Sequence, residues 1–352
     1  MKKTTKRILS FVLAVAMLFS LSSVAVLAAT SGSKYKSYVA LGDSIPGGYS
    51  LPAYKDLGVF CQDRVRIENS YPDLIGKNLG LDEGNEGTVK VMCKPGFRTT
   101  DFRVLLEDNY EGDYVTASTV RSYSGNNSYT VEGMKEERAD YKKAIQEADL
   151  VTLDICFNDT WLPFVGACEA IMADNPQLDM ETICNIPKYA NLIVESVFKM
   201  TVSLYTNYDK LVKDIYSINP NVTIVAVGCY NPFKDWTFPD GSPIRVGPLL
   251  QPLYNKINLW KMHYEKLYNT RQNTRYIFVN APDPEVISTS VNDLINGGFD
   301  NILKEGGWDP HPTTAGHEYI AQKILEKLGI EMTVHSTELA KEAEDVNAEA
   351  PA

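Results

Sequence analysis

The stretch YVALGDS at residues 38–44 is an apolar run that ends in a glycine and two small polar residues. A short aliphatic run closed by turn-forming residues is typical of a buried β-strand. Four comparable runs follow, and longer stretches with helical character separate them. The five expected strands are residues 38–41, 89–93, 150–155, 222–228 and 276–279.

The segments between these strands predict helices at residues 71–79, 135–148, 190–218, 249–268 and 315–328. Strands that alternate with helices predict an α/β fold, in which helices cover both faces of a parallel sheet. No linker is long enough to divide the chain, so residues 35–330 are expected to form one domain.

Three stretches interrupt this pattern and are expected to be loop insertions: residues 109–132, 160–187 and 231–248. Loops of this length in a compact domain usually have a function. Trp161 and Phe164 follow the third strand closely and are candidates for the substrate pocket. The other insertion aromatics, Phe233, Trp236 and Phe238, are candidates for a lid. Packing in the core or on the surface is an equally good alternative for each.

The two ends of the chain differ from the rest in composition. Four cations within the first seven residues precede an apolar stretch at residues 8–27, and Val26 and Ala28 are small residues at the spacing of a cleavage site. Residues 1–28 are therefore expected to be a signal peptide, with a membrane anchor as the alternative. Residues 336–352 are acidic and lack aromatic side chains, so this tail is expected to be disordered.

The charge of the chain limits its partners. The sequence has 34 basic and 45 acidic residues, a net charge of −11. Loss of the four cations in residues 1–28 leaves 30 basic against 45 acidic residues, a net charge of −15. Such a surface repels nucleic acids and anionic membranes. We therefore expect a secreted, extracellular monomer with no nucleic-acid partner and no stable membrane insertion.

The six cysteines are an even number, which in an exported protein permits disulfides. Cys156 and Cys229 end apolar runs and are expected to be buried thiols. The sequence has no C-x-x-C or H-E-x-x-H motif, so no metal site is expected. The two candidate disulfide pairs are Cys168 with Cys184 and Cys61 with Cys93.

In an open parallel sheet, ligands bind beyond the carboxyl ends of the strands. Ser44 follows the first expected strand, Gly96 the second and Asn158 the third. His311 lies just before the last expected helix. A hydroxyl, a backbone donor at a glycine, an amide and an imidazole are the groups that acyl transfer through a covalent intermediate requires.

Each of these groups has an expected role. A serine hydroxyl is a weak nucleophile until a base takes its proton, and His311 is the candidate base for Ser44. The backbone N–H groups of Ser44 and Gly96 and the side-chain amide of Asn158 are the candidate oxyanion donors. The structural alternatives are a turn serine, a turn glycine with positive φ and a helix-capping asparagine. This chemistry needs no metal and no cofactor.

Four segments resemble the sequence blocks of the SGNH (GDSL-type) hydrolases, and they occur in the order of that family. They are VALGDSI at 39–45, PGFRTT at 95–100, VTLDICFND at 151–159 and HPTTAGH at 311–317. The resemblance implies a flavodoxin-like three-layer αβα sandwich with a five-stranded parallel sheet in the order 2-1-3-4-5. It also implies a secreted lipase or esterase with Ser44 and His311 as nucleophile and base.

Two positions depart from the pattern of this family. Cys156 stands where the third block usually has glycine. The family usually has an aspartate three residues before the histidine, but Trp308 occupies that position and Asp309 lies two residues before His311. Either the Asp309 carboxylate or the Trp308 carbonyl is therefore a candidate to orient the imidazole. We favour Asp309, because an anion also stabilises the imidazolium; a plain turn residue before a proline is its structural alternative.

The sequence thus predicts a serine esterase that hydrolyses carboxylic esters of a small molecule, a lipid or a glycan. The α/β-hydrolase class is excluded, because Ser44 lies in Gly-Asp-Ser-Ile-Pro and not in G-x-S-x-G. An acyltransferase or a polysaccharide acetylesterase on the same fold is the first alternative. A binding module without catalysis is the second, and the presence of Ser44, Asn158 and His311 argues against it.

Overall fold

The computed structural model of the protein describes residues 34–57, 64–81, 89–112, 130–238, 240–289 and 309–337. Its compact unit begins at Ser37, and the account below concerns that unit. The expected signal peptide lies outside the described residues, as do the tail from residue 338 onward and most of the first expected insertion. Their structure is therefore left as a prediction.

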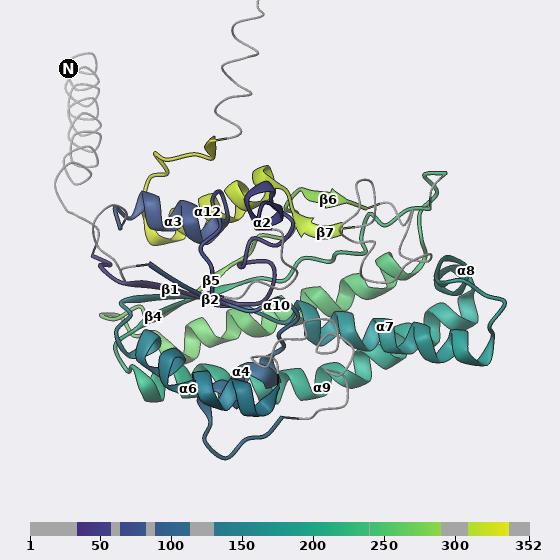
Figure 1. The fold of residues 1–352 in the computed structure, drawn as a ribbon, viewed down its shortest axis with the longest axis horizontal. Helices are drawn as coiled ribbons and strands as arrows, with labels where there is room; N and C mark the ends of the chain where they lie inside the picture. The colour runs from purple at the N-terminus through teal and green to yellow at the C-terminus, as the bar shows by residue number, and fades with distance from the viewer. Residues whose placement is uncertain are drawn as a thin grey trace, which may run out of the picture. The chain divides into compact units, whose positions relative to one another are not determined.

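A five-stranded parallel sheet forms the centre of the unit, and its strands match the five apolar runs (Figure 1). The strand order is β2-β1-β3-β4-β5, and every neighbouring pair is parallel. All residues of β1, β3 and β4 are buried, which explains their continuous hydrophobic character. The strands are β1 Tyr38–Gly42, β2 Val89–Cys93, β3 Leu150–Asp154, β4 Thr223–Val227 and β5 Tyr276–Val279.

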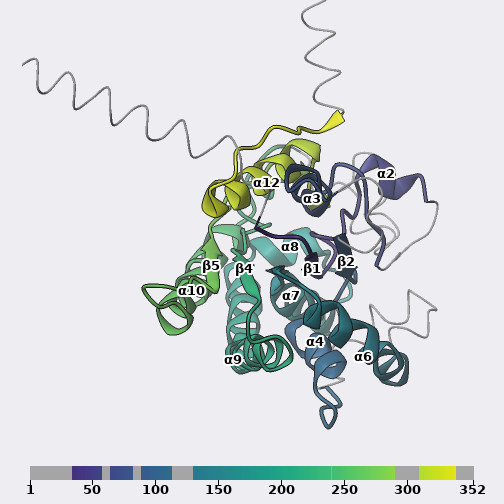
Figure 2. The same ribbon diagram turned by 90° about the vertical axis from the view of Figure 1, so that its left-hand side faces the viewer.

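Helices cover both faces of this sheet, which completes a three-layer αβα sandwich (Figure 1 and Figure 2). One layer consists of α3 (Tyr71–Asn78) and α12 (Thr314–Leu328), with the short α2 (Pro52–Lys55) beside them. The other layer contains α4 Thr99–Leu106, α6 Val131–Gln146, α9 Pro187–Ile218 and α10 Val246–Tyr268. The α/β fold, both helical layers and the strand order that the resemblance to SGNH hydrolases implies are therefore confirmed.

The prediction of a loop at residues 160–187 was wrong, because most of this segment is helical. It contains α7 (Phe157–Asp174) and α8 (Met180–Asn185), and α9 begins at Pro187. α7 contains Pro163 and Gly166, both poor helix formers, yet it packs along α9 and buries the apolar side chains of its first half. Burial against a neighbouring helix outweighs the poor helix propensity of these two residues.

The insertion at residues 231–248 is irregular, as expected, but two of its aromatic residues do not form a lid. Phe233 and Trp236 are 0% and 1% exposed, respectively, and they pack against the aromatic residues of α7. The ring centroids of Phe164 and Phe233 are 4.6 Å apart, and those of Trp161 and Phe164 are 5.5 Å apart. Trp161 and Phe164 are buried in the same cluster, which fastens α7 to the insertion by contacts that favour aromatic pairs.

The expected disulfide between Cys168 and Cys184 is absent. These cysteines lie on α7 and α8, and both are buried thiols in the helical packing. Cys93 is also a buried thiol, and its Sγ lies 3.4 Å from the carbonyl oxygen of Ala40. Its expected partner, Cys61, lies outside the described residues. The expectation of buried thiols is confirmed for the remaining two: Cys156 and Cys229.

Candidate active site

Ser44 lies two residues beyond β1, at the carboxyl edge of the sheet. The chain leaves the strand at Gly42, where a β-carbon would collide with the backbone oxygen of Asp154 at the end of β3. Glycine therefore permits the close approach of the two strand ends. The following turn is held by hydrogen bonds, one of them from the Tyr49 N–H to the Ser44 carbonyl at 3.0 Å. Ser44 is 6% exposed, so its hydroxyl is fixed at the rim of the site.

His311 reaches Ser44 from the other end of the sequence. It lies on β7 (Asp309–Pro312), which pairs with β6 (Val286–Ser288) in a small antiparallel sheet. The Tyr230 hydroxyl donates a hydrogen bond to the Pro310 carbonyl at 2.6 Å and thereby helps to fix this strand. The His311 Nε2 lies 2.8 Å from the Ser44 Oγ, so the two side chains are within hydrogen-bond distance.

Asp309 completes a chain of three hydrogen-bonded side chains. Its Oδ1 lies 2.7 Å from the His311 Nδ1 and also accepts the His311 backbone N–H at 3.0 Å. The carboxylate is 2% exposed, so solvent does not compete for it. An acceptor at Nδ1 favours the tautomer in which Nε2 is free to accept the serine proton. The carbonyl of Trp308, the alternative partner, lies outside the described residues.

Two aromatic rings flank the His311 imidazole. The centroid of Tyr49 lies 4.7 Å from the imidazole and that of Phe157 lies 6.4 Å from it. These rings limit rotation of the imidazole away from Ser44. The sequence did not identify this role, because both residues look like ordinary core aromatics.

Asn158 lies in the first turn of α7, beside the loop that carries Gly96. Its Nδ2 donates to the Phe97 carbonyl at 3.1 Å and to the Asp43 Oδ2 at 3.3 Å. Gly96 has a φ of +80°, a conformation that favours glycine, and it precedes Phe97 directly. The structure therefore brings the loops after β1, β2 and β3 together around the amide of Asn158, which is 4% exposed.

Asp159, the next residue of α7, also contacts the segment that follows β2. It accepts hydrogen bonds from the Thr99 backbone N–H at 3.0 Å and from the Thr99 hydroxyl at 2.6 Å. Burial raises the pKa of Asp159 to about 6, and the two bonds from Thr99 oppose that change. The carboxylate thus connects the start of α7 to the start of α4. This connection keeps Asn158 beside the loop that carries Gly96.

Two further buried carboxyl groups, Asp43 and Asp154, lie near Ser44. The sequence predicted a role for neither. Burial, together with the nearby Asp154, raises the pKa of Asp43 well above its usual range. Burial also raises the pKa of Asp154 to about 6, while its Oδ2 accepts the Tyr71 hydroxyl at 3.1 Å. Asp43 additionally accepts the Ile45 backbone N–H at 3.0 Å. The first bond joins α3 to the end of β3, and the second lies within the turn of Ser44.

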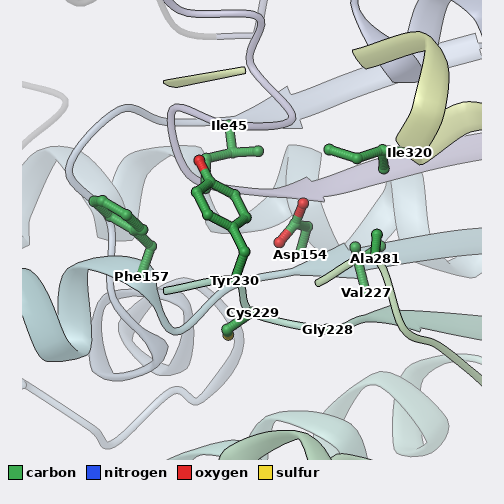
Figure 3. A pocket seen from close by; sticks show the side chains of 9 residues that line it. All are labelled: Ile45, Asp154, Phe157, Val227, Gly228, Cys229, Tyr230, Ala281 and Ile320. Carbon is green, nitrogen blue, oxygen red and sulfur yellow. The ribbon is translucent and has the colours of Figure 1, made fainter. Parts of the chain in front are cut away.

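A small cavity separates this carboxyl pair from the ends of β4 and β5. Its volume is about 10 Å³, which is room for a single water at most. Figure 3 shows the Asp154 carboxylate and the Tyr230 ring on the same side of the strand ends, with Ile45 and Ile320 above them. This cavity is therefore too small to hold a substrate.

His317 is a structural residue on α12. Its Nδ1 accepts the Tyr71 backbone N–H at 3.2 Å, and the side chain is fully buried. Burial, with a smaller effect from His311, lowers the pKa of His317 to about 3. The ring is therefore neutral at physiological pH, and it fastens α12 to α3.

The described residues contain no group of three or more histidine, cysteine or carboxylate side chains placed to hold a metal ion. Within the same residues, no helix combines the length and the apolar character that crossing a bilayer requires.

No known protein family and no curated protein matches the chain in sequence. Among solved structures, the chain is similar to an extracellular lipase from Streptomyces rimosus, with 17% identity and a TM-score of 0.48 over 84% of this chain and 98% of that chain. It is similar to phospholipase A1 from Streptomyces albidoflavus NA297, with 18% identity and a TM-score of 0.45 over 84% and 98% of the two chains. A family two carbohydrate esterase from Clostridium thermocellum, in complex with cellohexaose, has 13% identity and a TM-score of 0.37 over 85% and 67% of the two chains.

Proposed function

We propose that the protein is a serine esterase that hydrolyses carboxylic esters through an acyl-enzyme on Ser44. The observation that carries this proposal is the chain of short contacts from Ser44 through His311 to Asp309, with separations of 2.8 Å and 2.7 Å. A nucleophile, a base and an anion that orients the base are the three parts that serine acyl transfer requires.

The reaction starts when His311 Nε2 takes the hydroxyl proton of Ser44 as the Oγ attacks the ester carbonyl. The imidazolium that forms lies against the Asp309 carboxylate, which stabilises its positive charge. His311 then gives the proton to the departing alcohol, and the acyl group stays on Ser44. A water molecule, deprotonated by the same imidazole, releases the acid and restores the enzyme.

The tetrahedral oxyanion would be bound by the backbone N–H groups of Ser44 and Gly96 and by the amide of Asn158. The Asn158 Nδ2 carries two hydrogens, and Phe97 and Asp43 accept both in the free protein. The bond to Asp43 is the longer, so we propose that the oxyanion replaces this one. The Asp43 carboxyl is also a weak partner, because burial and the nearby Asp154 oppose its negative charge and raise its pKa.

We also propose that the enzyme acts outside the cell, after removal of residues 1–28. The support is the order of basic residues, an apolar stretch and small residues in that segment. N-terminal sequencing of the protein recovered from culture medium tests this proposal: the mature chain should begin at or near residue 29. A chain that stays with the cells and retains residues 1–28 contradicts it.

The decisive experiment is labelling with a fluorophosphonate. The wild-type protein should form one covalent adduct on Ser44, and Ser44→Ala should form none. Hydrolysis of p-nitrophenyl esters of rising chain length, beside acetylated xylan and pectin, then defines the acyl and alcohol groups. Addition of an alcohol acceptor separates an esterase from an acyltransferase, because a transferase yields mainly the new ester. An unlabelled wild-type protein would leave a non-catalytic binding module as the better explanation.

A further inference from the structure

Cys156 has a backbone conformation that is unfavourable for cysteine. Its φ is 116° and its ψ is −11°, in the left-handed region where a β-carbon is crowded. Glycine would adopt this conformation without strain, and glycine is the usual residue of the SGNH pattern at this position. A strained residue at the edge of a site is a reason to look for a function of its side chain.

A second thiol, Cys229, lies near Cys156 in the loop that follows β4. The register of β3 and β4 pairs Leu153 with Ala226, and Cys156 and Cys229 each follow these residues by three positions, beyond the ends of the two strands. The two thiols are close enough to influence each other's pKa, which rises for Cys156 and falls for Cys229. Both are buried, Cys156 at 0% and Cys229 at 7% exposure. A disulfide requires the two sulfur atoms to come within about 2.05 Å, so its formation draws the start of α7 and the end of β4 together.

A buried lysine lies against one of these two thiols. Lys261 of α10 is 0% exposed, and its Nζ lies 3.4 Å from the Cys229 Sγ. The same ammonium donates to the carbonyls of Ile155 at 2.9 Å and Val227 at 2.8 Å. A buried ammonium is stable only beside acceptors and negative charge, so Lys261 favours the ionised form of the Cys229 thiol.

The two thiols are therefore chemically different. The hydrogen bond from Cys156 and the positive charge of Lys261 lower the pKa of Cys229, although burial opposes them. Burial and the bond to Cys229 raise the pKa of Cys156 well above its usual range. Cys229 is thus the more acidic thiol of the pair and Cys156 the less acidic, which is the division that an attacking and a resolving cysteine require.

Cys229 also borders open space. The residue lies at the wall of an open groove of about 360 Å³, which α10 and the ends of β4 and β5 line. Figure 3 shows the Cys229 side chain on the opposite side of the strand end from Asp154 and Tyr230. Cys93 provides the contrast, because burial and the nearby carboxylates raise the pKa of that thiol well above its usual range.

We propose that Cys156 and Cys229 form a peroxide-sensitive redox pair beside the active site, with Cys229 as the attacking thiol and Cys156 as the resolving thiol. The Cys229 thiolate attacks one oxygen of hydrogen peroxide, the O–O bond breaks, and the other oxygen leaves as hydroxide and becomes water. The Cys156 sulfur then attacks the Cys229 sulfenic acid, its proton leaves with the hydroxyl as a second water, and the disulfide forms. Two thiols are oxidised and one peroxide is reduced to two waters.

The disulfide would also change the catalytic loop, and this part of the inference rests on the proposed function. Cys156 precedes Asn158 by two residues, at the start of α7. Fixing its sulfur to the end of β4 displaces the Asn158 amide, which is a candidate oxyanion donor. The oxidised enzyme should therefore have a lower kcat with little change in KM, and dithiothreitol should restore the rate.

The test is differential alkylation of the full-length reduced protein after treatment with hydrogen peroxide, followed by peptide mass spectrometry. The wild type should form a Cys156–Cys229 disulfide. Cys156→Gly, which suits the positive φ, should stop at a Cys229 sulfenic acid that dimedone traps. Lys261→Met should slow oxidation of Cys229, because the thiolate loses the positive charge that stabilises it. Cys93→Ser is the matched control and should oxidise like the wild type.

The thiol measurements do not depend on ester hydrolysis, so they can fail separately from the proposed function. A wild type that forms no Cys156–Cys229 disulfide overturns the redox pair. So does a Cys156→Gly variant whose Cys229 reacts no faster than Cys93. A disulfide that forms but leaves kcat unchanged overturns the effect on Asn158 and leaves the redox pair supported.

Discussion

The Oδ1 of Asp309 accepts two hydrogens of His311, one from the ring Nδ1 at 2.7 Å and one from the backbone N–H at 3.0 Å. The pair is separated by only one residue, Pro310, and proline restricts the residue before it to extended backbone. The orientation of the imidazole is therefore determined within a single short strand, and only Ser44 has to be brought to it from elsewhere.

Asp309→Asn tests this arrangement in catalysis. The amide can stabilise the wrong tautomer of His311 and cannot balance an imidazolium. The loss in kcat/KM should be large and could approach 10⁴-fold, the figure for the corresponding change in the Ser-His-Asp proteases. The measurement is kcat/KM on a p-nitrophenyl ester, with circular dichroism to check folding. A loss below about tenfold, or roughly 1.4 kcal/mol, would show that another group orients His311.

Ser44→Ala should abolish ester hydrolysis and leave the fold intact. The hydroxyl is the proposed nucleophile, and alanine fits the space of a serine that is 6% exposed. Initial rates at high enzyme concentration are the measurement, with the melting temperature as control. A folded variant that retains more than a few per cent of the wild-type rate would disprove the assignment.

Asn158→Ala should lower kcat by about 10²–10³-fold, the usual cost of one oxyanion donor. KM should change little, because the contact strengthens only in the transition state. Asn175→Ala, at the other end of α7, is the matched control and should keep the wild-type kcat. If Asn158→Ala instead raises KM at normal kcat, the amide binds the substrate and not the oxyanion.

Asp154→Asn should change how stability depends on pH. Burial raises the pKa of Asp154 to about 6, so the folded protein keeps this proton at pH values where the unfolded chain has lost it. The folded state binds more protons, and the stability from this group falls as pH rises from about 4 to about 6. The variant should therefore gain stability relative to the wild type between pH 4 and pH 8, by about 3 kcal/mol at most. Urea unfolding at both pH values measures the difference, and an equal offset at both would contradict the prediction.

Chelators should leave the activity unchanged, because each proposed step uses only side-chain and backbone groups of the chain. The measurement is the ester hydrolysis rate after incubation with EDTA and removal of the chelate. Inactivation that added metal reverses would contradict the mechanism.

The hydrophobic runs predicted all five strands of the sheet, and the boundaries differ from the structure by no more than one residue. Five of the helices were also predicted near their observed positions. The reason is that buried parallel strands are apolar throughout and covering helices are long, so both leave a strong local pattern. The segment at residues 160–187 was not predicted correctly, because α7 is stabilised by contacts with α9 and with the insertion at 231–248 and not by its own propensity.

The sequence by itself determined the fold class and the candidate nucleophile, base and oxyanion donors, because each follows a strand or precedes a helix in a recognisable local pattern. Only the tertiary structure decided that Asp309 contacts His311 and that Tyr49 and Phe157 flank the ring. It also decided that Cys168 and Cys184 remain thiols and that Lys261 lies against Cys229. These relations depend on which side chains of distant segments come into contact and on how deeply they are buried. A local sequence pattern determines neither of them.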